Sequence, residues 1–469
     1  MGHGDPQETG ARVSFKDKRF LAGWAVLVVL AAGHVVVGRA LPAVEQDPVS
    51  ELQNGSRHKG RQERFLYVAT IAQSPSDPDF VAIVGADPRE DDFGQIVNRI
   101  DMPNVGDELH HFGYSADQHR LIVPGLFSNR VHIFDIERKG PDRGKTMTLT
   151  AVNEDLAAAS GYIIPHSVIA TSPGRAIITM IGAATATTQP GGIVQINDAT
   201  GAFEGYFGPG PLRDPGTLGP TYMYDFDALV EANRGISTTF GPPARCGGGI
   251  DPACLGSEVA VWDLRRQKVI QVADLGANNG ALEVRFIERR DTRRAFINTP
   301  GTNAVWLADD DDDDGVFEFQ QVLGPGDGLF LPVDMLLSYD NKYMYVTNWF
   351  GNTVQQFDIS DPFHPVLKAT VPVPHPNMLR LSGDNTRLYV SNSLLTPWDN
   401  DPNFGPARHS DYGIWLFEVD TRAGGLTPFN RAGNAWVSFA LVQKMNTAGP
   451  AGPHMMLFDP SIRLRPGEH

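Results

Sequence analysis

Histidine is the residue type whose positions in this chain most directly suggest chemistry. His110 and His111 are adjacent and precede an apolar stretch, while His166, His375 and His454 each follow a proline. Neutral imidazoles are good ligands for copper in either oxidation state, and three or four of them would leave a position for a substrate. We therefore treat these five histidines as candidate metal ligands, with copper as the expected cofactor.

Three carboxylates form a second candidate group. Asp225, Glu283 and Asp334 each stand six residues before a turn that carries a charged residue. Carboxylates near a metal can orient its imidazole ligands or relay protons to a substrate. They can equally bond the backbone amides of neighbouring segments, which is a purely structural use. We assign the three residues a catalytic role and keep the structural alternative open.

These residues belong to a structural unit that recurs along the chain. The unit is a polar residue, a short strand, a turn with Asp or Gly, an apolar strand and a second apolar strand, as in His111 to Ile136. A period of roughly 45–75 residues with several short strands is typical of a β-propeller. Six units are internal, and a seventh can form from strands near the two ends of the chain. The sequence therefore predicts an all-β, seven-bladed β-propeller over residues 64–469, closed by its N- and C-terminal strands.

In a propeller the start of each innermost strand faces the central channel, so the marked residues should converge in space. Adjacent strand residues face opposite ways, so only one of His110 and His111 should point inward, unless the strand starts after them. His119, beside a turn, and His132, on an alternating strand, are expected to face solvent. The predicted ring around the channel consists of His110 or His111, Asp225, Glu283 and Asp334, with His166, His375 and His454 above it.

The first 43 residues are expected to be a targeting segment. A polar stretch ending in Lys18 and Arg19 precedes an apolar run over residues 20–37, and small residues follow that run. This pattern is typical of a secretory signal peptide, and the run is also about long enough to remain as a membrane anchor. In both cases we expect the chain outside the cytoplasm, in the periplasm, with residues 44–63 as a linker.

Composition adds three expectations. The net charge of −16 over 469 residues argues against nucleic acid as a partner. Cys246 and Cys254 are the two cysteines, and outside the cytoplasm we expect a disulfide between them, with a metal or redox thiol pair as the alternative. The six consecutive aspartates from Asp309 to Asp314 are expected to form a solvated hairpin tip. A calcium site there would need oxygens from other segments, because adjacent Asp side chains diverge.

Several strings in the chain resemble one protein family. Residues 102–111, Met-Pro-Asn-Val-Gly-Asp-Glu-Leu-His-His, look like the MPN-x-x-DELHH signature of the selenium-binding protein family, also called methanethiol oxidases. The resemblance runs from about residue 64 to residue 458. Further similar strings lie at Tyr224–Phe226, Val261–Asp263, Leu282–Phe286, Asp334–Ser338, Thr347–Trp349, Gln356–Pro362 and Leu388–Asp399.

The resemblance implies a seven-bladed propeller with copper held by histidines of the channel. It also implies oxidation of methanethiol by oxygen to formaldehyde, hydrogen sulfide and hydrogen peroxide. The chain departs from the family pattern, however. A second histidine of the family is replaced by Ile169, the position of the selenium-linked cysteine falls at Gly94, and the C-terminal Asp-Ile-Trp is replaced by residues 461–465. His375, conversely, stands where the family usually has a small residue.

Three functional hypotheses follow from these observations. The first is a copper-dependent oxidase of a small thiol, with oxygen as the second substrate. The second is an extracytoplasmic metal-binding, selenium-binding-like scaffold that has lost catalysis, as the replacement at Ile169 would allow. The third is a lactonase-like hydrolase that uses a hard cation held by carboxylates, and it ranks last because the strings match a different family.

Overall fold

A computed structural model provides the fold of the chain. It describes residues 63–460 apart from 185, 209–221, 247–253, 289–292, 311, 313, 402–410, 431–432 and 444–447. The predicted targeting segment and nearly all of the predicted linker lie outside these residues. In the part of the chain that is described, no helix is both long and apolar enough to cross a membrane.

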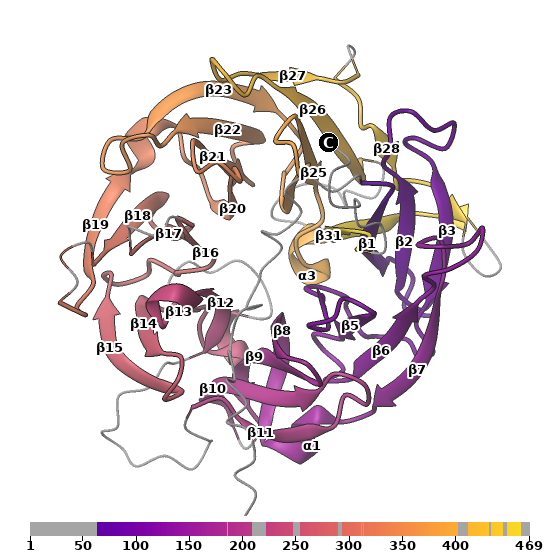
Figure 1. The fold of residues 1–469 in the computed structure, drawn as a ribbon, viewed down its shortest axis with the longest axis horizontal. Coiled ribbons are helices and arrows are strands. Elements are labelled where there is room, and N and C mark those ends of the chain that lie inside the picture. Colours follow the sequence, from indigo (N-terminus) through magenta and orange to yellow (C-terminus); the bar gives the residue numbers. More distant parts are fainter. Residues whose placement is uncertain are drawn as a thin grey trace, which may run out of the picture. The chain divides into compact units, whose positions relative to one another are not determined.

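Seven antiparallel sheets surround a central channel like the blades of a propeller, as predicted (Figure 1). Six of them are formed by consecutive strands that follow one another from the channel outward. The first three are β4 (Gly113–Tyr114), β5 (Arg120–Pro124), β6 (Val131–Ile136) and β7 (Met147–Asn153); β8 (Tyr162–Ser172), β9 (Arg175–Ala183), β10 (Ala186–Asn197) and β11 (Phe203–Tyr206); and β12 (Met223–Leu229), β13 (Arg234–Thr239), β14 (Glu258–Asp263) and β15 (Lys268–Asp274). The next three are β16 (Val284–Phe286), β17 (Arg294–Thr299), β18 (Ala304–Asp309) and β19 (Glu318–Leu323); β20 (Pro332–Leu337), β21 (Tyr343–Asn348), β22 (Thr353–Asp358) and β23 (Val366–Pro372); and β24 (Leu379–Leu381), β25 (Arg387–Ser391), β26 (Gly413–Val419) and β27 (Leu426–Pro428), with β28 (Val437–Ser438) also paired to β26.

The seventh blade closes the ring by combining the two ends of the described chain. Its innermost strand is β31 (Ala451–Phe458), followed outward by β1 (Phe65–Ala72), β2 (Phe80–Gly85) and β3 (Ile96–Asp101). The Tyr67 hydroxyl on β1 donates to Asp459, just beyond β31, at 3.1 Å. The predicted closure by N- and C-terminal strands is thus confirmed, and β31 and β1 pair directly at the join.

The blades are held together by apolar side chains on both faces of each sheet. Leu66 and Val68 of β1 pack with Tyr389 and Ile414 of the preceding blade. Phe65 and Tyr67, the alternate residues of the same strand, pack with the following blade instead. Inner strands are therefore apolar on both faces, whereas the outermost strands, such as β23, are largely exposed.

The recurring turn has the same hydrogen bond in three blades. The hydroxyls of Ser115, Ser338 and Ser382 each donate at 2.6 Å to the aspartate two residues later. The same hydroxyl of Ser115 accepts the backbone N–H of Arg120 at 3.0 Å. This closed turn fixes where the inner strand ends and the next begins, which is the physical basis of the repeat.

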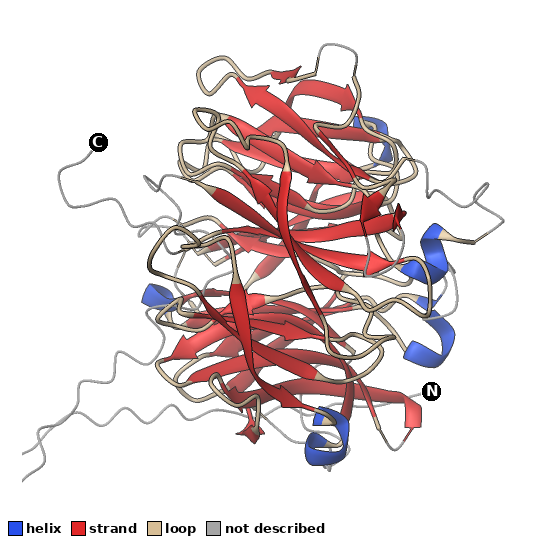
Figure 2. Ribbon diagram, turned by 90° about the vertical axis from the view of Figure 1, so that its right-hand side faces the viewer, coloured by secondary structure: helices blue, strands red, loops and turns tan. Residues whose placement is uncertain are grey.

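The helices are short and lie in connections between strands (Figure 2). They are α1 (Leu156–Ser160), α2 (Pro243–Cys246) and α3 (Thr396–Asp399), with single 3-10 turns η1 (Val230–Ala232) and η3 (Pro325–Asp327). A small hairpin, β29 (Val442–Gln443) and β30 (Ala448–Gly449), precedes β31. Of these, α3 lies beside the central channel (Figure 1), where its residues can take part in a site.

Candidate metal centre and the pocket above it

Four histidines meet in the channel. Ring centroids are 3.6 Å apart for His110 and His454, 4.0 Å for His111 and His166, and 4.9 Å for His110 and His166. All four side chains are buried. Ligand atoms of His110, His111 and His166 lie within 4.8 Å of one another. The fold therefore gathers imidazoles from three blades into one cluster.

Both members of the adjacent pair belong to this cluster. The strand β4 starts only at Gly113, so His110 and His111 precede it, and the rule that neighbours face opposite ways does not apply to them. The segment is held by buried acidic side chains. Asp107 accepts from Ser128 and Arg130 at 2.5 Å and 3.0 Å, and Glu108 accepts from a backbone N–H of α3 at 2.6 Å.

The hydrogen bonds of three histidines fix which ring nitrogen carries the proton. Nδ1 of His166 lies 3.0 Å from the Tyr224 carbonyl oxygen, and Nδ1 of His454 lies 2.7 Å from the Ser393 carbonyl oxygen. A carbonyl only accepts, so both Nδ1 atoms donate. Nδ1 of His111 lies 3.3 Å from the Ser167 hydroxyl oxygen, whose own proton goes to Asp225 at 2.8 Å. Each of these rings is thereby left with a lone pair on Nε2.

Those Nε2 atoms have no hydrogen-bond partner among the described residues. This holds for His111, His166 and His454, and the buried Nδ1 of His110 is unpartnered as well. Buried polar atoms normally find partners, so a convergent set of open lone pairs is a suitable place for a ligand. Nitrogen donors of this kind suit copper and other late first-row metals, and the residues therefore fit the expected cofactor.

Electrostatics keeps the cluster neutral. Burial lowers the pKa of His166 to about 4 and that of His454 to about 3. The pKa values of His110 and His111 are lowered well below the ordinary range, by burial first and then by the neighbouring imidazoles. Neutral imidazole is the form that binds metal, so the site is ready for a cation at physiological pH.

His375 lies apart from this cluster. Its backbone has a positive φ of 44°, and its N–H donates to Asn352 at 2.9 Å. The ring packs edge-on against Trp349, with centroids 4.9 Å apart. Ring contacts join the other four histidines to one another. The structure therefore places this candidate ligand in a separate aromatic contact.

The three predicted carboxylates converge below the histidines, around Arg285. The guanidinium lies 2.6 Å from Asp225, 2.7 Å from Glu283 and 3.5 Å from Asp334. Burial raises the pKa of Asp334 to about 6 and, with the charge of Asp225, raises that of Glu283 well above its ordinary value. Burial alone would raise the pKa of Asp225 too, but Arg285 and hydrogen bonds bring it below its ordinary value.

The sequence did not reveal the residues that connect the histidine cluster to the three carboxylates. Arg285 lies inside one of the strings that resemble the family, but nothing in the sequence marks it as a site residue, since one arginine on a short strand is common. Ser167 links His111 to Asp225, and Tyr224 stacks on His166 with centroids 3.8 Å apart. Ile169, where the family has a histidine, packs in the core between blades with Ile177, and is no part of the histidine cluster.

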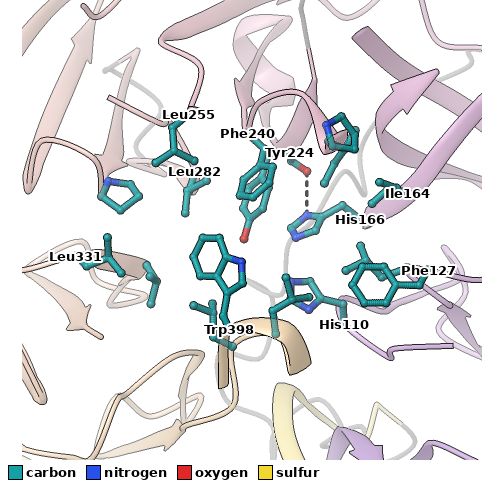
Figure 3. Close-up of a pocket in the computed structure, with 17 residues that line it drawn as sticks. His110, Phe127, Ile164, His166, Tyr224, Phe240, Leu255, Leu282, Leu331 and Trp398 are labelled. Atoms are coloured by element: carbon teal, nitrogen blue, oxygen red, sulfur yellow. Dashed lines mark hydrogen bonds between the residues drawn. The ribbon is translucent and has the colours of Figure 1, made fainter. Parts of the chain in front are cut away.

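An apolar pocket opens above the histidines (Figure 3). Its volume, including the open mouth, is about 810 Å³. His110 and His166 form part of its lining, and α3 contributes Trp398. The hydroxyl of Tyr224 points into the same space (Figure 3). Small molecules can therefore reach the histidine cluster through a largely apolar chamber.

The predicted disulfide is confirmed, and it braces this chamber. Cys246 and Cys254 are bonded, with Cα atoms 5.5 Å apart. Both are buried and pack with Leu255, which lines the pocket together with Pro243 at the start of α2. The covalent link therefore ties together the two segments that supply Pro243 and Leu255 to the pocket wall.

The two histidines expected to face solvent differ from each other. The prediction is right for His119, which is exposed, and wrong for His132, which is fully buried. Nδ1 of His132 lies 3.1 Å from the Val123 carbonyl oxygen, and its Nε2 lies 3.8 Å from Asp107. The alternation rule failed because β6 is covered on both faces by neighbouring blades.

The aspartate run is partly buried. Asp310 is buried and accepts the Gly315 N–H at 3.0 Å, while Asp312 and Asp314 are exposed. The three carboxylates lie within 4.8 Å of one another. Asp310 thus shapes the hairpin tip, Asp312 and Asp314 are exposed, and calcium binding there remains a prediction.

Comparison with known proteins gives a consistent picture. The model of the 56 kDa selenium binding protein family matches residues 45–459. A methanethiol oxidase of Homo sapiens is 26% identical over 431 residues, covering 78% of this chain and 88% of that protein. Selenium-binding protein 2 of Arabidopsis thaliana is 26% identical, covering 78% and 86%. A hypothetical selenium-binding protein from Sulfolobus tokodaii shares the fold, with a TM-score of 0.72 and 24% identity over 86% of this chain and 95% of that one. The chain therefore belongs to the 56 kDa selenium-binding protein family.

Proposed function

We propose that this protein is a copper-dependent oxidase of thiols that acts in the periplasm. The observation that carries the proposal is the set of three buried Nε2 lone pairs on His111, His166 and His454, together with His110. Their N–H groups are already bonded, so the rings are oriented before any metal arrives. The similarity to proteins named methanethiol oxidase supports a thiol as the substrate.

The proposed reaction consumes one thiol, one oxygen molecule and one water. The carbon next to sulfur loses two electrons and its bond to sulfur, and becomes an aldehyde. Sulfur leaves as hydrogen sulfide, and oxygen takes up the two electrons and two protons as hydrogen peroxide. For methanethiol the aldehyde is formaldehyde. Copper, when bound, would supply the redox chemistry between the thiol and oxygen.

The protein's own residues would position the reaction and handle its protons. The path from Nδ1 of His111 through the Ser167 hydroxyl to Asp225 fixes the His111 ring. Arg285 holds Asp225 in its charged form. Burial raises the pKa of Glu283 well above its ordinary value, and its side chain is hydrogen-bonded to Asp225. Glu283 can therefore give up or accept a proton close to the site.

Two observations support a location outside the cytoplasm. The Cys246–Cys254 disulfide is of a kind that persists in oxidising compartments. The basic and apolar pattern over residues 1–37 suits export or anchoring. Cell fractionation of a bacterium that expresses the full chain tests this part, and recovery in the cytoplasm alone would contradict it.

The decisive test is copper content of the exported protein, compared among three forms. We expect about one copper per chain in the parent and none in a His111→Ala, His166→Ala double variant. His375→Ala is the matched control, because that ring packs against Trp349 outside the cluster, and it should keep its copper. The parent should also consume oxygen when methanethiol is added. A parent that binds no copper and oxidises no thiol would favour the non-catalytic scaffold instead.

A further inference from the structure

The pocket above the histidines is much larger than methanethiol requires. Its lining draws on side chains from several blades, among them Ile181, Leu282 and Leu395, and one methyl group could touch only a small part of this wall. Methanethiol ends at a single methyl group, so with its sulfur at the histidines it would occupy only the floor. The remaining space would hold water against aliphatic and aromatic walls, which is an unfavourable arrangement. The size of the chamber therefore points to a larger occupant.

The lining excludes charged occupants. None of the described residues that line the pocket carries a carboxylate, ammonium or guanidinium group. Its walls are formed by side chains such as Ile181, Leu282, Leu331 and Leu395. A cysteine-like or peptide thiol would bring an ammonium or carboxylate into this space without a counter-charge, at a high desolvation cost. The occupant must therefore be uncharged and mainly apolar.

A few polar groups are placed where one end of such a molecule would lie. His110 and His166 present ring nitrogens, and the Tyr224 hydroxyl points into the pocket (Figure 3). Trp398 is buried, and its indole N–H has no partner among the described residues. Phe127, which lies beside His110 in Figure 3, lines the pocket and is 43% exposed. The chamber is thus polar at the histidines and apolar along the rest of its wall.

We propose that the substrates of this protein are uncharged primary thiols, R–CH2–SH, in which R is a bulky apolar group, alkyl or aryl. The sulfur lies at the histidines and the group R lies against the apolar walls of the chamber. The inference rests on the proposed function, since the same reaction then converts the thiol, oxygen and water to the corresponding long-chain aldehyde, hydrogen sulfide and hydrogen peroxide. Oxygen is the oxidant and is reduced by two electrons, as before.

The chamber can be tested without metal or turnover. Straight-chain alcohols keep the apolar group but cannot be oxidised at sulfur, and their binding to the metal-free protein can be followed by calorimetry. Burying each methylene should tighten binding roughly fourfold, so 1-octanol should bind roughly two-hundredfold more tightly than 1-butanol. Leu282→Trp, which fills the chamber, should weaken octanol binding at least tenfold. Leu441→Trp is the control, because Leu441 is 74% exposed, and it should change nothing.

The substrate preference is tested with the copper-loaded protein. We expect kcat/KM for 1-octanethiol to exceed that for methanethiol and for cysteine at least a hundredfold, and Leu282→Trp to reduce the ratio of octanethiol to methanethiol turnover. Methanethiol oxidation without octanol binding, or with cysteine preferred, would overturn the inference and leave the proposed function standing. Octanol binding without oxidation of any thiol would instead overturn the proposed function, and the thiol assignment with it. If Leu282→Trp fails to fold, the binding of the alcohol series to the parent protein still tests the inference.

Discussion

Nδ1 of His454 lies 2.7 Å from the carbonyl oxygen of Ser393. The two residues belong to different blades, because His454 is on β31 of the closing blade and Ser393 follows β25 of the blade before it. The Asn377 side-chain N–H also donates to this carbonyl, at 2.6 Å. The bond that orients this imidazole therefore spans the join of the ring. The strand that closes the propeller therefore also brings His454 into the histidine cluster.

Ser167 offers the sharpest test of how the cluster is oriented. Its hydroxyl connects His111 to Asp225 and also lies 3.2 Å from Nδ1 of His166. In Ser167→Ala the His111 ring loses the acceptor for its N–H, and we expect copper affinity to fall by about 10–100-fold. Competition titrations with a copper chelator measure this change.

Ser115→Ala is the matched control for Ser167→Ala. Ser115 is equally buried, but its hydroxyl caps the turn beside Asp117, away from the histidines. That variant should lose some stability and keep its copper affinity. Equal affinities in the parent and Ser167→Ala would mean that packing alone orients His111.

The sequence was enough to predict the fold because the propeller repeats itself. The Ser–Asp turns at Ser115, Ser338 and Ser382 set a common register, and strands near both ends supply the seventh blade. The same register predicted that Asp225, Glu283 and Asp334 would converge. Regular spacing places residues on a shared axis, so this much of the site follows from sequence.

The remainder of the site depends on loop geometry and on neighbouring blades, which spacing does not encode. His375 was expected on a loop above the channel, and spacing could not show that its ring would pack against Trp349. His132 was expected at the surface, but adjacent blades bury both faces of β6. The pocket could not be predicted from the sequence, because residues from several blades line it.

Arg285 is expected to be essential for stability. Its guanidinium pairs with Asp225, Glu283 and Asp334, which are buried, and its own side chain is 14% exposed. Arg285→Met leaves the carboxylates without compensation, and we expect the free energy of unfolding at pH 7 to fall by about 3–5 kcal/mol. The deficit should shrink at acidic pH, because protonation removes the repulsion. Urea unfolding at pH 7 and pH 5 measures both effects.

Arg175→Met provides the comparison for Arg285→Met. Arg175 pairs with Glu204 at 3.0 Å, but its side chain is 56% exposed, so removing it should change stability little. A deficit for Arg285→Met that is no larger than that for Arg175→Met would contradict the view of a compensated buried charge cluster.

The disulfide should stabilise both the fold and the pocket wall. It closes a short loop, so the double variant Cys246→Ser, Cys254→Ser is expected to lose about 2–3 kcal/mol of unfolding free energy. Because Leu255 packs against this bond and lines the pocket, octanol binding should weaken as well. A reductant should lower the stability of the parent and leave the variant unchanged. An effect of reductant on the variant would point to a cause other than this bond.

The buried histidines should make the stability of the metal-free protein depend on pH. Burial lowers the pKa of His454 to about 3, against 6.5 for an unperturbed histidine. Between these values the unfolded chain holds a proton that the folded chain does not, so this residue makes the protein less stable as pH falls below about 6.5. The contribution is at most about 1.4 kcal/mol per pH unit.

His454→Asn isolates this effect from the other titrating groups. The Asn side chain can still donate to the Ser393 carbonyl but has no proton to gain. The difference in unfolding free energy between the parent and this variant should be constant above pH 7. As pH falls from 6.5 to 4.5, the parent should lose stability relative to the variant. Urea unfolding in the presence of a chelator measures it. His364→Asn, at a site 81% exposed, is the control, and the same trend there would show that burial in the cluster is not the cause.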